Sequence, residues 1–315
     1  MGLTSRLAYS IGGLALLILL TALARHRGLI GRGSAGTFAW LVTHVTLPAL
    51  IFSSLAGGSL APHRLDLAAS MLAAELACLL LAWLAAGLLR LGRKRKGSFM
   101  LVSAFGSSAL LGYALVTQVF PGSDTAMSDA VIISEIGVAP TLFVAGVWIA
   151  MWYGRDTAGA GGAGRASIRF LYSPVFVSLV LGIAFSAVRL PDSQAVAALT
   201  ALLRTVGSAN TLLVAITVGL LLEFEGLGDM LAVSAVSSGI KLVAQPLVAL
   251  SVIAVLGVSA MGRNVLLLQT AMPAATLAVV FSHQYGCDSR AASFMLLVST
   301  VLSAVTVPVL FSVLG

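Results

Sequence analysis

The chain alternates between long apolar stretches and short polar ones. An apolar stretch of about 20 residues, at 1.5 Å per residue, crosses a hydrocarbon core about 30 Å thick as an α-helix. The pattern predicts ten membrane-spanning helices, at residues 6–24, 34–56, 67–89, 98–120, 127–152, 170–188, 199–223, 230–256, 263–284 and 291–313. The links between them are too short for a separate water-soluble domain. The sequence therefore predicts an all-α integral membrane protein.

The composition agrees with this class. Of the 315 residues, 59% are hydrophobic and only 9% are charged, too few charges to cover the surface of a water-soluble domain of this size. The net charge is +7, and a basic run at residues 90–96 follows a predicted helix. Basic residues in that position contact anionic lipid headgroups. We therefore expect membrane lipids, and not nucleic acid, as partners.

Lysine and arginine residues also indicate the orientation. The links after odd-numbered predicted helices hold twelve of them, whereas the other side holds five. Because cytoplasmic links are enriched in basic residues, the odd-numbered links are predicted to lie in the cytoplasm. Both termini of this multi-pass protein are then expected on the extracytoplasmic side of the cytoplasmic membrane.

The longest link, residues 154–169, contains a glycine-rich run at 159–164 and has no lysine of a phosphate-binding loop. We interpret it as a cytoplasmic linker between a first repeat at 1–153 and a second repeat at 170–315. Each repeat has five predicted helices. Since five is odd, the second repeat is inverted relative to the first, as in many transporters.

The predicted ninth helix contains a proline. Pro273 stands between Met272 and Ala274 in an otherwise apolar stretch. Proline removes a backbone donor and clashes with the preceding turn, and lipid has no water to satisfy the released carbonyl. We therefore predict a helix break here, of the kind with which many transporters build a substrate site.

The inverted repeat pairs the ninth helix with the fourth. The fourth contains Gly106, Ser107, Ser108 and Gly112, residues that weaken a helix or compete for its backbone groups. Small residues of this kind also serve close helix packing, which is the alternative interpretation. Their pairing with the proline of the ninth helix favours a second break.

Three charged residues lie well inside predicted helices: Lys241, Glu75 and Glu135. A charge at the bilayer centre costs about 2.5 to 3.5 kcal/mol, so such residues usually face the protein interior. Lys241 either steadies carbonyls released at the break, which we favour, or attracts a substrate carboxylate; snorkelling to the headgroups is a third interpretation. The two glutamates are either proton carriers or structural partners of a hydroxyl or of Lys241.

Uncharged polar residues complete the predicted substrate pocket. They are Ser107, Ser108, Asn210, Gln269 and Thr276. With helix N-termini freed at the breaks, their donors could hold a carboxylate without a full positive charge. The alternative for each of them is an interhelical hydrogen bond worth about 0.6 to 2 kcal/mol.

Signals of catalysis are weak. The four histidines are scattered, and no metalloprotease, nucleophile-elbow or C-x-x-C motif occurs. Cys78 and Cys287 are placed too differently to bridge or to form a metal site. We therefore expect no enzyme, no catalytic residue, no bound metal and no cofactor.

Several stretches resemble one family. They are Leu47 to Phe52 (LPAL-x-F), Lys241 to Leu247 (KL-x-x-x-P), Met272 to Thr276 (MPAA), and Ser299, Thr300 and Pro308 in the last helix. In order and spacing they resemble the auxin efflux carrier family, the PIN-like transporters that include bacterial organic-acid carriers. The resemblance extends from about residue 38 to 310.

The resemblance implies a bile-acid symporter/PIN-like fold. This fold has two inverted five-helix repeats, a scaffold domain and a transport domain, with discontinuous fourth and ninth helices that cross. The family's Asn and Pro at the fourth-helix crossing are here Ser107 or Ser108 and Ala114, so we expect a less sharp break in that helix. It also implies a location in the bacterial inner membrane.

The sequence therefore predicts a secondary carrier that moves a small organic anion or weak carboxylic acid by alternating access. One alternative is a sodium-coupled symporter of the bile-acid type, and another is a membrane sensor that binds its ligand without moving it. The coupling ion (H⁺ or Na⁺) and the oligomeric state, a homodimer included, stay open.

Overall fold

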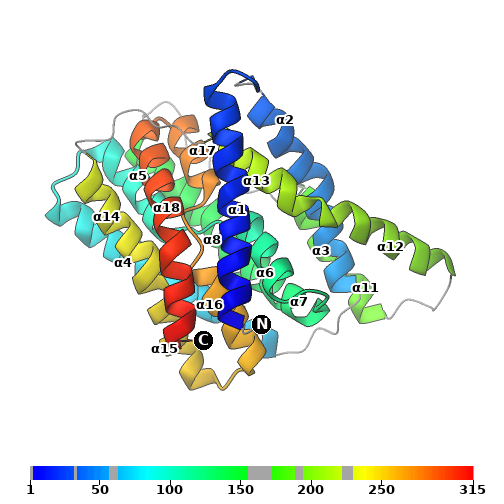
Figure 1. Cartoon of the computed structure of the whole chain (residues 1–315). Helices are drawn as coiled ribbons and strands as arrows, with labels where there is room; N and C mark the ends of the chain where they lie inside the picture. The colour runs from blue at the N-terminus through cyan, green and yellow to red at the C-terminus, as the bar shows by residue number, and fades with distance from the viewer. Residues whose placement is uncertain are drawn as a thin grey trace. The chain divides into compact units, whose positions relative to one another are not determined.

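The computed structural model describes residues 3–31, 34–56, 63–154, 172, 174–188, 194–221 and 230–314. Over these ranges the chain is helical and contains no β-strand (Figure 1). The linker predicted at 154–169 lies, apart from its first residue, outside the described residues.

The α-helices overlap every range that the hydrophobic pattern predicts. In chain order they are α1 (Leu3–His26), α2 (Ser34–Leu41), α3 (Leu47–Ala56), α4 (His63–Leu88), α5 (Arg93–Ala104), α6 (Tyr113–Val119), α7 (Asp124–Ile132), α8 (Ala139–Thr141), α9 (Val147–Tyr153), α11 (Pro174–Val188), α12 (Gln194–Ser208), α13 (Asn210–Leu221), α14 (Leu231–Gly239), α15 (Gln245–Leu256), α16 (Ala260–Thr270), α17 (Thr276–Gln284) and α18 (Ser289–Leu314). Within the described part of the chain, six helical stretches are long and apolar enough to cross a membrane.

Wider π-helical turns join several of these helices. They are η1 (Val42–Thr46), η2 (Ser108–Gly112), η3 (Ile133–Val138), η4 (Leu142–Gly146) and η5 (Ile240–Ala244). Pro48, Pro140 and Pro246 follow η1, η3 and η5 within two residues. A proline ring clashes with the carbonyl four residues earlier, so a wider turn before it relieves the clash. The helix therefore continues past each of these prolines.

The chain divides into two compact units. Unit 1 comprises Met1–Arg64, Ala109–Val131 and Phe170–Leu222, and unit 2 comprises Leu65–Ser108, Ile132–Arg169 and Glu223–Gly315. Each unit draws segments from both predicted repeats. The boundaries of the units therefore do not coincide with those of the repeats.

In unit 1, α11 and α12 pack against α3, and α1 packs against α13 and α6. A Cβ atom on Gly207 would lie 3.0 Å from the Cα atom of Leu50, so the missing side chain lets α12 approach α3 closely. One turn residue, Ala209, lies between α12 and α13, and Gln194–Thr217 is nonetheless one helical stretch long and apolar enough to cross a membrane. The exposed Arg204 forms an ion pair with Asp124 at 2.9 Å.

In unit 2, α18 packs against α14, α5 and α17 (Figure 1). The helix α5 also packs against α9. Apolar side chains such as Phe99, Leu101 and Met295 fill the space among these helices and are almost fully buried. Buried polar residues are also common in this unit.

Candidate functional site

Two helices of unit 2 are interrupted, and the interruptions meet. The chain leaves helical geometry between α5 and η2 and again between α16 and α17. Gly106 in the first gap pairs with Ala274 in the second as an isolated antiparallel bridge. We call this pair of gaps, residues 105–107 and 271–275, the crossover.

Backbone groups released by each gap are satisfied by the other. The Ser107 amide donates to the Pro273 carbonyl at 2.8 Å, and the Ala275 amide donates to the Phe105 carbonyl at 2.8 Å. Phe105 has extended backbone angles, φ −97° and ψ 127°. The fourth helix is therefore fully interrupted, and our expectation of a less sharp break was wrong. The first gap contains no proline, and its backbone groups are satisfied by the extended backbone of the second gap.

The last helix of the chain supports the crossover from a third side. The Ala274 amide donates to the Ser299 hydroxyl at 3.2 Å, and Ser299 in turn donates to the Leu296 carbonyl at 2.9 Å. Both Ala274 and Ser299 are buried. Since a buried backbone amide without an acceptor costs about 1 to 3 kcal/mol, Ser299 holds the second gap in place.

Two side chains from one helix cap the C-terminal ends of both interrupted helices. The Lys241 ammonium donates to the Thr270 carbonyl at 2.8 Å, at the end of α16. It also donates to the Gln245 amide oxygen. The Gln245 amide nitrogen donates to the Ala104 carbonyl at 3.2 Å, at the end of α5. Lys241 and Gln245, four residues apart on one helix face, therefore bind both negative helix ends.

Gly106 is required for this arrangement. A Cβ atom at position 106 would lie 2.7 Å from both Cε and Nζ of Lys241. Lys241 is itself fully buried, so its ammonium does not reach the headgroups in this conformation. The bond from the Lys241 ammonium to the Thr270 carbonyl agrees with the first of the roles predicted for Lys241, that of a cation beside carbonyls released at a helix break.

The two glutamates lie at different places in unit 2. Glu75, on α4, is fully buried, and neither of its oxygens has a hydrogen-bond partner among the described residues. Glu135 is buried in η3. The Lys241 charge acts on Glu75.

The predicted pocket residues divide between the units. Ser107, Ser108, Gln269 and Thr276 belong to unit 2, whereas Asn210 belongs to unit 1. The Asn210 side-chain oxygen accepts a hydrogen bond from Thr46 at 3.0 Å. Its amide nitrogen is buried without a partner in the described part of the chain.

Within unit 2, Ser107 and Gln269 have spare polar atoms. The Ser107 hydroxyl and both amide atoms of Gln269 are buried and have no partner within the described ranges. The Ser108 and Ser134 hydroxyls lie 3.0 Å apart. Thr276 begins α17 and is buried.

The remaining residues expected at the breaks, Met272 and Gly112, differ in position. Met272 lies inside the second gap, where its carbonyl would be 3.6 Å from a Cβ atom on Gly106. Gly112 is the last residue of η2 and lies outside the first gap. In the predicted fourth helix, the residues with low helix propensity therefore extend beyond the residues at which the helix is interrupted.

Sequence reasoning did not name Gln245, Thr270 or Ser299 as parts of the site. Gln245 had a usable signal, since it follows Lys241 by four residues and so shares its helix face. Thr270 contributes only its backbone carbonyl. Every residue type has one, so the sequence gives no signal for this position. Ser299 acts through a tertiary contact 25 residues away in sequence.

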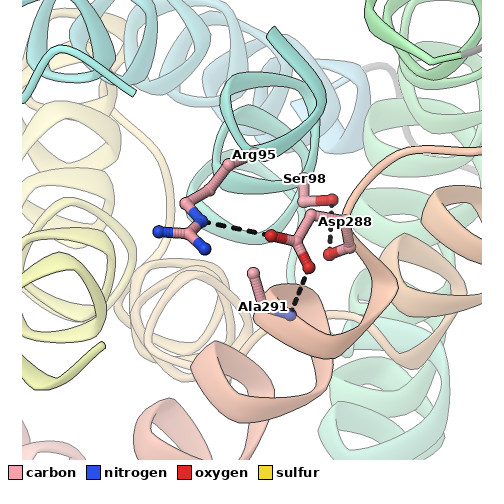
Figure 2. A network of polar contacts seen from close by, with 4 residues as sticks. All are labelled: Arg95, Ser98, Asp288 and Ala291. Atoms are coloured by element: carbon pink, nitrogen blue, oxygen red, sulfur yellow. Dashed lines mark hydrogen bonds and ion pairs between the residues drawn. The ribbon is translucent and has the colours of Figure 1, made fainter. Parts of the chain in front are cut away.

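A polar network joins the start of α5 to the start of α18 (Figure 2). Arg95 donates to one Asp288 carboxylate oxygen at 3.1 Å, and the Ala291 amide donates to the other at 3.0 Å. The Ser98 hydroxyl donates to the Asp288 carbonyl at 2.8 Å. Asp288 is therefore both the N-cap of α18 and the link to α5, whose other end is in the crossover.

We expect Asp288→Ala to lower the free energy of unfolding by about 1 to 2 kcal/mol, mainly through loss of the N-cap. Chemical denaturation in detergent would measure this. Arg95→Gln should cost less than about 1 kcal/mol, because the Arg95–Asp288 pair is partly exposed and screened. Asp288→Asn keeps a capping oxygen. An Asn variant as unstable as the Ala variant would contradict the capping role.

The Cys287 thiol lies next to this network and is buried. It donates to the Ala150 carbonyl at 3.2 Å. Burial, with the neighbouring Asp288 charge, raises the pKa of the Cys287 thiol to about 11. The thiol is therefore protonated at neutral pH and acts as a packing group.

Comparison with known proteins gives two matches. A family model described as "Membrane transport protein" matches residues 11–156 and 164–311. A protein of Methanothermobacter thermautotrophicus (strain Delta H), named as an uncharacterized transporter, is 26% identical over an alignment of 301 residues, and the alignment covers 93% of each chain. Both matches extend over nearly the whole sequence.

Proposed function

Since the chain belongs to the membrane transport protein family, the auxin efflux carrier family, we propose that it is a secondary carrier for a small organic anion or weak carboxylic acid. It is a multi-pass membrane protein with several apolar helices. Our proposal includes ten crossings in two inverted repeats, both termini outside the cytoplasm, and transport by alternating access in the inner membrane. The observation that carries it is the crossover in unit 2.

The electrostatics of the crossover favour an anion. Lys241 and Gln245 occupy the C-terminal carbonyls of α16 and α5. The helices that resume after the gaps begin at Ser108 and Thr276, and helix N-termini attract negative charge. The spare polar atoms of Ser107 and Gln269 supply further hydrogen-bonding groups. We propose that a carboxylate binds at these N-terminal ends.

The same contacts argue against sodium coupling. Sodium-coupled carriers with broken helices hold the cation at unwound carbonyls and helix C-termini. Here the Thr270 carbonyl already accepts from the Lys241 ammonium, a cation that is part of the chain. We therefore propose that this carrier does not need sodium.

Counterflow in liposomes tests the proposed function. Liposomes with purified protein and an unlabelled carboxylate inside are given the labelled carboxylate outside, using acetate, lactate, benzoate and succinate in turn. We expect protein-dependent accumulation of at least one of them, unchanged when choline replaces sodium. A requirement for sodium would favour the symporter. Ligand-induced thermal stabilisation without counterflow would favour the sensor.

Ser108→Ala tests the binding role of the crossover. We expect a KM raised by about threefold to tenfold, since one hydrogen bond is worth about 0.5 to 1.5 kcal/mol, with a smaller change in the maximal rate. Initial rates of uptake would show it. Ser134→Ala is the matched control, because it removes the other hydroxyl of the Ser108–Ser134 pair. Equal effects of both substitutions would assign Ser108 a structural role only.

A further inference from the structure

Glu75 carries a carboxyl group that is buried within unit 2. Its side chain is fully buried in α4, and both oxygens lack a partner in the described part of the chain. The Thr141 hydroxyl is close enough to act on it. That hydroxyl, however, donates its proton to the Gly137 carbonyl at 3.0 Å. The Thr141 hydroxyl therefore has no proton left to donate to a Glu75 carboxylate in this conformation.

The surrounding charges do not neutralise Glu75 by direct contact. Lys241 on η5 acts on it through space, but the Lys241 ammonium donates to Thr270 and Gln245. Among the other described elements that contact α4, η3 carries the buried Glu135, α16 carries Arg263 near its exposed start, and α5 carries Lys96, whose ammonium lies over the Trp83 ring of α4. On α4 itself, Cys78 lies one turn away and contacts the Ile240 carbonyl.

An ionised carboxylate in this place would be costly. Taking such a charge out of water is unfavourable unless hydrogen bonds or a close counter-ion compensate. The protonated acid carries no net charge and avoids most of this cost. The protonated form of Glu75 is therefore favoured while the side chain is buried away from water, and the ionised form is favoured once water reaches the carboxyl group.

We propose that Glu75 binds and releases a proton during the transport cycle. When water reaches the carboxyl group, its O–H bond breaks, the proton passes to water as hydronium, and the carboxylate remains. The reverse step restores the acid before the site closes again. This inference rests on the proposed carrier function for its role, and its chemistry can be tested without any substrate.

Infrared difference spectroscopy of the purified full chain tests the proton itself. We expect a protonated-carboxyl C=O band at neutral pH that disappears at alkaline pH in the wild type and is missing in Glu75→Gln. Ser70→Ala, a control on the same helix whose hydroxyl donates to the Asp66 carbonyl at 2.7 Å, should keep the band. If Glu75→Gln fails to fold, Glu75→Asp should shift the band. A pH-dependent band unaffected by both substitutions, or no such band in the wild type, overturns the proposal.

Transport measurements then separate this inference from the proposed function. In liposomes with a pH gradient and the same four carboxylates, Glu75→Gln should keep counterflow but lose the gradient-driven accumulation that exceeds that of protein-free liposomes, into which weak acids pass as neutral molecules. Gradient-driven accumulation above the protein-free level that is retained in Glu75→Gln overturns the proton role and leaves the carrier intact. Absence of all transport by the wild type would overturn the carrier function, whereas the infrared result would still decide whether Glu75 exchanges a proton.

Discussion

Lys241→Met is expected to lower carboxylate transport at least about tenfold, a loss of about 1.4 kcal/mol or more in the transition state. Methionine has a similar shape but no donor, so the Thr270 carbonyl and the Gln245 amide oxygen both lose their partner. Each buried acceptor left bare costs about 1 to 3 kcal/mol. Removing a buried charge offsets part of this, so we expect a net loss of about 1 to 3 kcal/mol in unfolding free energy.

Initial uptake rates and chemical denaturation in detergent would measure the two effects. Lys94→Met is the matched control, because Lys94 is an exposed lysine at the start of α5. It should leave uptake within about twofold. Lys241→Gln keeps an amide donor and should recover part of the stability. Unchanged uptake in Lys241→Met would remove Lys241 from the transport machinery, although the helix arrangement would stand.

Local chemistry explains why parts of this site were predictable. The cost of a proline inside a membrane helix pointed to the gap at Pro273, although the same cost produces no gap at Pro48, Pro140 or Pro246, where a wider turn lets the helix continue. The depth of Lys241 within an apolar stretch likewise indicates an interior role. Both arguments need only the neighbouring residues along the chain.

Tertiary contacts explain what the sequence could not supply. The first gap has no proline and is stabilised by hydrogen bonds to residues about 170 positions later, at Pro273 and Ala275. Asn210, which we grouped with residues of the crossover, belongs to a different compact unit. Which polar residues of different helices lie together can be known only from the tertiary structure.

Gly106→Ala is expected to be almost as damaging as loss of Lys241. The new methyl carbon would lie 2.7 Å from Cε and Nζ of Lys241, well inside van der Waals contact. Lys241 is held by two acceptors and fully buried, so it cannot move aside without breaking hydrogen bonds. Overpacking of this kind costs about 1 to 3 kcal/mol, and we expect uptake to fall about tenfold or more.

A double-mutant cycle shows whether the clash with Lys241 is the cause. In a Lys241→Ala background the opposing atoms are gone, so adding Gly106→Ala should cost no more than about 0.5 kcal/mol of unfolding free energy. Gly239→Ala is the control, because that exposed helical glycine has no atom within 4 Å of a new Cβ. It should be neutral or stabilising by up to about 1 kcal/mol. Costs that simply add in the double variant would mean that the methyl group meets something other than Lys241, and the close approach of the crossover to this side chain would then be wrong.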